Sequence, residues 1–109
     1  MTTDHARTVG ELATLVRSKN AGPFWLTLEI FCNSIAEYNE VAAPDVITPQ
    51  RIADVYSTDP DSVRIFRLPE LRVIKISFPR PTVQGAIADR DMHAGQQHVP
   101  LARLRVRPP

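Results

Sequence analysis

The sequence predicts an α+β fold: a two-layer sandwich in which a small mixed or antiparallel sheet carries helices on one face. Three observations lead to this prediction. A strongly alternating apolar stretch at residues 24–31 indicates a strand, segments with helical spacing and capping signals lie on both sides of it, and two further alternating stretches follow at residues 63–78. The 109 residues fit one domain over 1–109, and no linker or internal repeat divides them.

The first predicted element is a helix from about Val9 to Lys19. Thr8 and Glu11 have the spacing of a capping box, which satisfies two amide donors at a helix start. Asn20 and Gly22 are typical of a helix C-terminal end. Residues 1–7, which precede this helix, are predicted to be a flexible N-terminus. The apolar residues that share one helical face are Val9, Leu12, Ala13 and Val16.

The strongest strand of the sequence is PFWLTLEIFC. Its even-numbered residues form a wholly apolar face, whereas the odd-numbered residues form a mixed face. We therefore expect this strand to be central in the sheet, with its apolar face under the helices. The residues of the apolar face are Phe24, Leu26, Leu28 and Ile30.

Two short helices are predicted next, in NSIAEYNEVA and TPQRIADVYS. Ser34 and Glu37 repeat the capping-box spacing, and Thr48 is a suitable N-cap before Pro49. In the first of these helices Ile35, Tyr38 and Val41 or Ala42 share a face. DPDSV is a turn or a single helical turn. VRIFRL and LRVIKISF then predict an antiparallel hairpin joined at PE. One face of its second strand carries Ile74, Ile76 and Phe78.

A segment without clear periodicity extends from Pro79 to Pro100. Loops longer than about 12–15 residues are uncommon in compact domains unless they are functional or disordered. We therefore predict that residues 79–100 form a long functional loop.

The closing stretch LARLRVRPP alternates apolar residues with arginines and predicts a last strand. The arginines would form one charged face, which either binds an anionic partner or protects an edge strand from aggregation. The apolar residues are Ala102, Leu104 and Val106, and the arginines are Arg103, Arg105 and Arg107.

Composition and charge exclude several classes of protein. A net charge of +1 is too small for a typical nucleic-acid-binding domain. A single cysteine, Cys32, allows no internal disulfide, so we expect a reducing, cytoplasmic setting. No apolar stretch has the length of a signal sequence or a membrane span. Cys32 follows the central strand, and we interpret it as a buried structural residue.

The stretch DMHAGQQHVPL contains the strongest candidates for a site. His98 titrates near neutral pH and could act as a general acid or base, with Gln96 and Gln97 orienting a substrate or a partner. The alternative is structural, since the same side chains can satisfy the backbone of a long loop.

Two weaker candidates lie elsewhere in the sequence. Lys19 and Asn20 could contact an anionic group, or they could cap the first helix. Asp89, Asp91 and His93 alternate and could hold a metal together with His98, but no repeated ligand spacing supports this. We therefore expect no bound metal and no cofactor.

The stretches RSKNAGPFWLTLEIF, ISFPRP and GQQHVPL together resemble a small uncharacterised bacterial family. Its members are encoded beside, or fused to, proteins of the AtuA type, named for acyclic terpene utilisation. The resemblance extends from about Thr8 to Val106. It implies a companion of a larger protein in carboxylic-acid or terpenoid catabolism and carries over no catalytic residue. The segment from Gln96 to His98 matches the family pattern, whereas the segment from His93 to Gly95 departs from its aromatic-Gly-Ala order.

Two functional hypotheses follow. In the first, the protein is an accessory small subunit that docks on a larger AtuA-like protein and completes its site with residues 91–101. In the second, it is a small stand-alone lyase or isomerase of a carboxylate, with His98 as acid or base and Lys19 or Arg80 as a basic partner. The sequence lacks a clear acid–base pair, which favours the first hypothesis. It predicts no nucleic-acid or membrane partner, and leaves open a small carboxylate or acyl substrate in the complex and a homo-oligomer.

Overall fold

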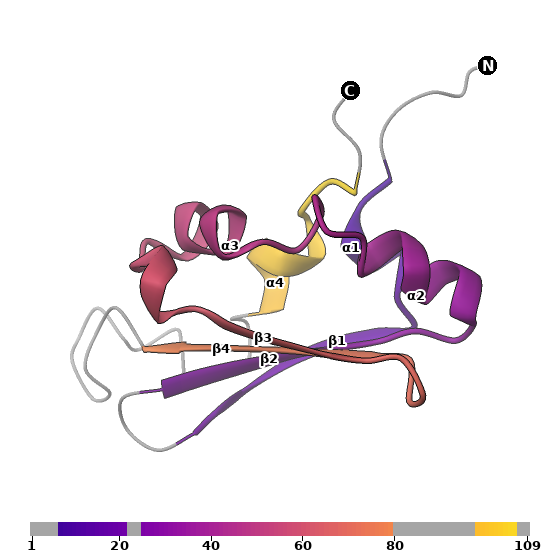
Figure 1. Ribbon diagram of the computed structural model, residues 1–109, viewed down its shortest axis with the longest axis horizontal. Helices are drawn as coiled ribbons and strands as arrows, with labels where there is room; N and C mark the ends of the chain where they lie inside the picture. Colours follow the sequence, from indigo (N-terminus) through magenta and orange to yellow (C-terminus); the bar gives the residue numbers. More distant parts are fainter. Residues whose placement is uncertain (1–6, 22–24, 80–97, 107–109) are drawn as a thin grey trace.

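The computed structural model describes residues 7–21, 25–79 and 98–106 (Figure 1). In these residues, four strands form a sheet in the order β1-β2-β4-β3, and every neighbouring pair is antiparallel. The described helices all lie on one face of this sheet (Figure 1). The predicted α+β two-layer fold is therefore confirmed, with a purely antiparallel sheet. In chain order the elements are α1 (Val9–Leu12), β1 (Leu15–Asn20), β2 (Trp25–Phe31), α2 (Ile35–Val41), α3 (Pro49–Tyr56), the 3-10 helix η1 (Pro60–Ser62), β3 (Arg64–Leu68), β4 (Val73–Pro79) and α4 (His98–Ala102).

The strand β2 is central, as its apolar alternation predicts. It pairs with β1 on one side and with β4 on the other. Leu26, Leu28 and Ile30 are buried beneath the helices. Phe24, the fourth residue of the predicted apolar face, lies outside the described residues.

The predicted hairpin is confirmed as β3 and β4, although its turn is longer than PE. Residues 69–72 form this turn, in which the Leu71 amide donates to the Leu68 carbonyl oxygen and the Arg72 amide donates to that of Pro69. Arg72 closes the turn in the left-handed region, with a φ of 56°. The predicted buried face of β4 is confirmed, with Ile74, Ile76 and Phe78 fully buried.

The helices α2 and α3 begin where their capping signals predict. The Ser34 hydroxyl accepts from the Glu37 amide, and the Thr48 hydroxyl accepts from the Arg51 amide. Of the apolar residues expected to share a face of α2, Tyr38 and Val41 are buried, whereas Ile35 is exposed. The buried residues that these two helices contribute to the core are Tyr38, Val41, Ile52, Ala53 and Tyr56.

The predicted helix from Val9 to Lys19 is wrong beyond Leu12. The capping box of Thr8 and Glu11 is present, but α1 contains only four residues. Residues 15–20 instead form β1, which pairs along its whole length with β2. This pairing satisfies the backbone of the strongest strand, and it outweighs the local helical preference of the segment. The predicted helix C-cap at Asn20 is therefore wrong as well.

The predicted last strand is also wrong. The helix α4 occupies residues 98–102, and the following segment makes an isolated bridge between Arg105 and Thr8. The Val9 amide donates to the Leu104 carbonyl oxygen, and the Val106 amide donates to that of Arg7. The apolar alternation of the closing segment is real, because Leu104 and Val106 are buried. It reflects packing against the N-terminal segment and not membership of the sheet.

The loop predicted from Pro79 to Pro100 is shorter at both ends, because Pro79 belongs to β4 and His98–Pro100 belong to α4. Residues 80–97 lie outside the described residues, as do 1–6 of the predicted flexible N-terminus. Arg7 is held by the hydrogen bond from Val106.

The helices α1 and α4 pack closely at Gly10. A Cβ atom at this position would lie 3.0 Å from the carbonyl oxygen of Ala102 and 3.1 Å from its Cβ. The absence of a side chain therefore lets the first and last described helices approach each other.

Candidate functional site

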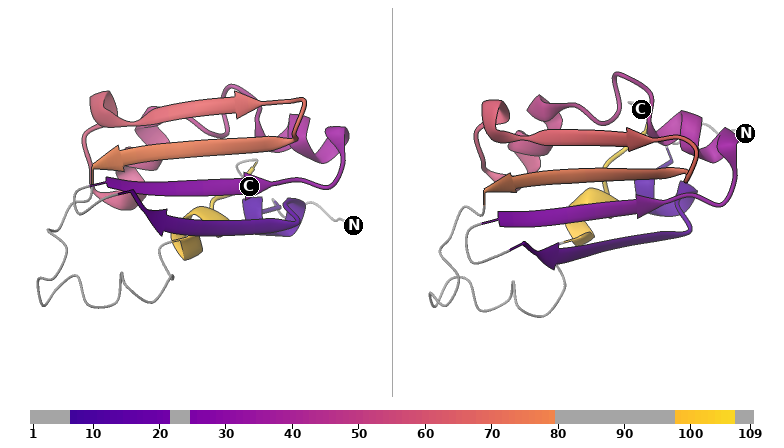
Figure 2. Two further views of the ribbon diagram at one scale, coloured as in Figure 1. Left: turned by 90° about the horizontal axis from the view of Figure 1, so that it is seen from below. Right: turned by 60° about the horizontal axis from the view of Figure 1, so that its bottom comes forward.

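The face of the sheet that points away from the helices is turned toward the viewer in the left view of Figure 2. We call it the open face, since no described helix covers it (Figure 1). The antiparallel registers arrange its side chains in rows across the strands. From the β3–β4 turn outward, the first row is Leu15, Phe31, Val73 and Leu68; the second is Arg17, Glu29, Lys75 and Phe66; the third is Lys19, Thr27, Ser77 and Arg64; and the fourth is Trp25 and Pro79.

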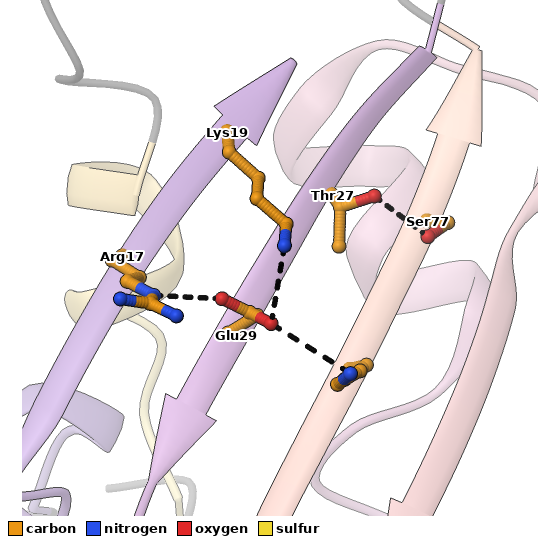
Figure 3. A network of polar contacts seen from close by, with 6 residues as sticks. Arg17, Lys19, Thr27, Glu29 and Ser77 are labelled. Atoms are coloured by element: carbon orange, nitrogen blue, oxygen red, sulfur yellow. Dashed lines mark hydrogen bonds and ion pairs between the residues drawn. The ribbon is translucent and has the colours of Figure 1, made fainter. Parts of the chain in front are cut away.

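Glu29 lies at the centre of the open face, and it is the one charged residue that is buried among the described residues. Its side chain is 4% exposed, although it lies on the uncovered side of the sheet. Arg17 Nε donates to Glu29 Oε1 at 2.7 Å, while the ammonium groups of Lys19 and Lys75 lie 3.8 and 3.9 Å from Oε2 (Figure 3). Three cations from two neighbouring strands therefore surround one carboxylate.

The environment of Glu29 keeps this carboxylate ionised. Burial has the largest single influence and raises its pKa. The hydrogen bond from Arg17 and the positive charges of Lys19, Arg17 and Lys75 together outweigh burial. The pKa therefore lies below the usual value of 4.5. A carboxylate held this way is a structural counter-ion, because it is poorly suited to accept a proton near neutral pH.

A pair of hydroxyl groups adjoins this charged centre. Thr27 Oγ1 and Ser77 Oγ are hydrogen bonded at 3.0 Å (Figure 3). In the register, Lys19 lies on one side of the pair and Arg64 on the other. The third row therefore contains two hydroxyls between two cations.

An apolar band borders the charged centre, in the row toward the β3–β4 turn and, at Phe66, beside it on β3. We define it as Leu15, Phe31, Phe66 and Leu68. Leu15 is 48% exposed and Phe66 51% exposed. Leu71, in the adjoining turn, is more exposed still. Large apolar side chains gathered at one end of a sheet face are typical of a surface that contacts another molecule.

The ring of Phe31 is partly covered by Arg17. The guanidinium carbon lies 5.0 Å from the ring centroid, which is within the range of a cation–π contact. The same guanidinium group donates to Glu29. Arg17 therefore connects the apolar band to the charged centre.

The predicted site residues do not come together in the described residues. Lys19 contributes to the charged centre on the open face. His98 begins α4, which lies on the helix side of the sheet and packs against α1, α3 and β1. Asn20 ends β1. The described residues do not include Gln96, Gln97 or Arg80. They also do not include Asp89, Asp91 or His93, which were considered as metal ligands.

The helix that begins at His98 is held in place by a hydrogen bond with a structural role. The amide of Leu101, in the same helix, donates to the hydroxyl of Tyr56 at 3.0 Å. Burial raises the pKa of Tyr56, and the hydrogen bond from Leu101 lowers it by less. The tyrosine therefore remains a neutral phenol that links α3 to α4 at Leu101.

Cys32 is buried in the core, as the sequence predicts. Burial, and to a lesser degree the negative charge of Glu37, raises the pKa of its thiol. A neutral buried thiol is a poor nucleophile. The structure thus supports a packing role for Cys32.

The remaining features of the described residues provide no metal site and no membrane-spanning helix, and a depression beside α2 is lined by residues other than the predicted ones. No group of three or more His, Cys, Asp or Glu side chains in the described ranges could hold a metal ion. No helix in those ranges could cross a membrane. A depression of about 390 Å³ next to α2 includes neither His98 nor Lys19. Its lining residues are Asn39, Glu40, Ala43, Asp45, Val46 and Val106.

The residues of the charged centre other than Lys19 were not predicted from the sequence. Glu29 stood on the mixed face of the strongest strand, where a lone carboxylate between apolar residues is an unusual choice. This unusual position in the sequence could have indicated a charged site. Its partners could be assigned only with the strand order, which brings β1 and β4 to either side of β2.

The fold and the open face together define a small α+β domain whose sheet has one helix-covered face and one face of mixed charged and apolar side chains. The family described as domain of unknown function (DUF4387) matches residues 9–105, so the chain belongs to that family. Neither the curated proteins nor the solved structures include a match to this chain.

Proposed function

We propose that this domain is an accessory small subunit that docks through the open face of its sheet on a larger AtuA-like protein. The observation that carries the proposal is the apolar band, in which Leu15 and Phe66 remain about half exposed. Burying a large apolar side chain stabilises a complex by about 1.5–3 kcal/mol. A partner that covers the band therefore gains affinity from several side chains that the isolated chain leaves in water.

The identity of the partner rests on the resemblance of this sequence to small proteins encoded beside, or fused to, AtuA-like proteins. In this proposal the complex acts in carboxylic-acid or terpenoid catabolism in the cytoplasm. The 91–101 segment completes the site of the larger protein. The helix α4, which begins at His98, packs against the edge strand β1, so a partner that extends past this edge comes close to α4.

The stand-alone enzyme receives no specific support from the geometry. Its proposed acid or base, His98, belongs to the helix side of the sheet, whereas Lys19 contributes to the open face. Catalysis by this pair would require both groups to reach one substrate.

The proposal is tested by measuring binding of the purified chain to the AtuA-like protein encoded beside it. Phe66→Ala and Leu15→Ala should each weaken binding by about tenfold or more, which corresponds to about 1.4 kcal/mol. Ile35→Ala is the matched control, because Ile35 is a similarly exposed apolar residue on α2, on the helix side. Absence of binding by the unmodified chain, or equal losses in the control, would contradict the proposal.

The role of His98 has a separate test. His98→Ala should leave the melting temperature of the isolated domain nearly unchanged and should lower the activity of the complex or its affinity. If the substitution instead unfolds the domain and leaves the activity of each assembled complex intact, His98 is a structural residue.

A further inference from the structure

We propose that the partner surface that docks on the open face is acidic, and that its Asp or Glu carboxylates bind a basic patch formed by Arg17, Lys19, Arg64 and Lys75. This inference rests on the proposed function for the choice of face. It adds the chemistry of the partner, which the apolar band alone does not define.

The positive charge of the open face exceeds the net charge of the whole chain. Four cationic side chains and one carboxylate, Glu29, belong to the open face, which gives this face a net charge of +3. The whole chain carries only +1, so the remaining residues carry −2. The net positive charge of this nearly neutral protein therefore lies on the face that no described helix covers, and the rest of the chain is net negative.

The one carboxylate of the open face cannot neutralise the four cations of the basic patch. Glu29 is buried and already within 4 Å of three of them. The side chains of Arg17, Lys19 and Lys75 are 54%, 57% and 45% exposed, so they can meet a further carboxylate at the surface. A protein interface that covers this face without supplying negative charge would bury four cations against a single carboxylate, which is costly.

Lys19 and Arg64 lie at opposite ends of the third row of the open face. These residues lie on β1 and β3, with β2 and β4 between them. At about 4.8 Å between strands, their backbones are about 14 Å apart, which suits two or more carboxylates better than one. The hydroxyls of Thr27 and Ser77 lie between them, and their mutual hydrogen bond uses only one of the two hydroxyl hydrogens. The second hydrogen can be donated to a carboxylate of the partner.

Two other occupants fit this face less well. A second copy of the chain would bring one +3 surface against another, and this repulsion opposes a dimer through the face. A single-stranded nucleic acid would need free aromatic rings for base stacking. The ring of Phe31 is covered by Arg17, and Trp25 and Phe66 lie on different strands and in non-adjacent rows.

The first test measures binding to the AtuA-like protein by a variant with Lys19→Gln and Arg64→Glu. Neutralising Lys19, without reversing its charge, avoids placing a second carboxylate beside Glu29. The variant should lose at least about tenfold in affinity, and binding of the unmodified chain should weaken as salt rises. The matched control carries Arg7→Glu and Ala36→Glu, the same change in net charge at exposed positions away from the open face. Urea unfolding of both variants verifies that they fold.

If the unmodified chain binds the AtuA-like protein and the patch variant binds it equally well, the acidic-partner inference is overturned while the proposed function stands. Loss of affinity in the patch variant alone supports the inference. Loss that is equal in the control overturns it, because net charge and not the basic patch would then govern binding.

A second probe decides the inference if the AtuA-like protein does not bind. In this case the proposed function fails, and an NMR titration with a synthetic peptide of alternating Asp or Glu and Leu takes its place. Amide shifts concentrated on the four strands, and absent with a peptide in which Lys replaces the acidic residues, support an acidic partner. Three outcomes each overturn the acidic-partner inference. The first is the absence of shifts at millimolar peptide, and the second is tighter binding of a single-stranded oligothymidylate. The third is a dimer of the unmodified chain that the patch variant abolishes.

Discussion

Replacing Glu29 by glutamine removes the negative charge at the centre of the sheet while preserving the size of the side chain. The hydrogen bond from Arg17 is charge-assisted, and such bonds contribute about 1.5–3 kcal/mol. Glutamine keeps an oxygen acceptor, so part of this contribution remains. Lys19 and Lys75 are roughly half exposed and nearly 4 Å away, so each adds at most about 1 kcal/mol.

Together these contributions give an expected loss of about 2 kcal/mol in the free energy of unfolding for Glu29→Gln near neutral pH. The assay is equilibrium unfolding in urea. With a slope of about 2 kcal/mol per molar, the midpoint should fall by about 1 M. Glu70→Gln is the control, because Glu70 is an exposed carboxylate in the β3–β4 turn and should change stability by less than about 0.5 kcal/mol.

The pH dependence separates charge from packing. The pKa of Glu29 is lower in the folded chain than its usual value of 4.5. Its ionised form therefore stabilises the fold fully above the unfolded pKa, and this stability is lost as pH falls through the folded pKa. The difference between the unmodified chain and Glu29→Gln should shrink between about pH 6 and pH 3. A variant as stable as the unmodified chain, or a difference that widens as pH falls, would refute the reasoning.

Three further outcomes are expected. Leu28→Ala should lower the free energy of unfolding by about 2–5 kcal/mol, because Leu28 is fully buried in the central strand. A loss below about 1 kcal/mol, measured by urea unfolding, would show that the core is elsewhere. Tyr56→Phe should lower the free energy of unfolding by about 1–3 kcal/mol in the same assay, since the buried amide of Leu101 loses its acceptor while the ring stays. An unchanged urea midpoint would mean that another group replaces the hydroxyl. Elemental analysis of the purified protein should find no stoichiometric transition metal, and about one metal ion per chain, lost on His98→Ala, would contradict this.

The elements with strong local signals were predicted well from the sequence. Alternating apolar residues at 26, 28 and 30 indicate a buried strand wherever it lies in the sheet, and Thr48 with Pro49 indicates a helix start without reference to the rest of the fold. These signals depend on period and on capping, which are properties of neighbouring residues.

The segment from Leu15 to Asn20 could not be assigned in the same way. Its burial alternates weakly because it is an edge strand, and Val16 is compatible with both a helical face and a strand face. The pairing with β2 and the charge of Glu29 decide its conformation, and both are properties of the assembled sheet. The charged centre was missed for the same reason, since Arg17 and Lys75 become neighbours of Glu29 only through strand order.

The close contact between the first and last described segments has a consequence for synthesis on the ribosome. Val9 and Leu12, which are made early, pack in the same core cluster as Leu101 and Leu104, and the Leu104 carbonyl oxygen accepts from the Val9 amide. The chain emerges from its N-terminal end, so α1 can contact α2 early but cannot complete its packing until almost the whole domain has been translated. The sheet can pair earlier, but its helix layer is completed by residues 98–106. Folding of this domain is therefore expected to finish late and cooperatively, because its ends close the core together.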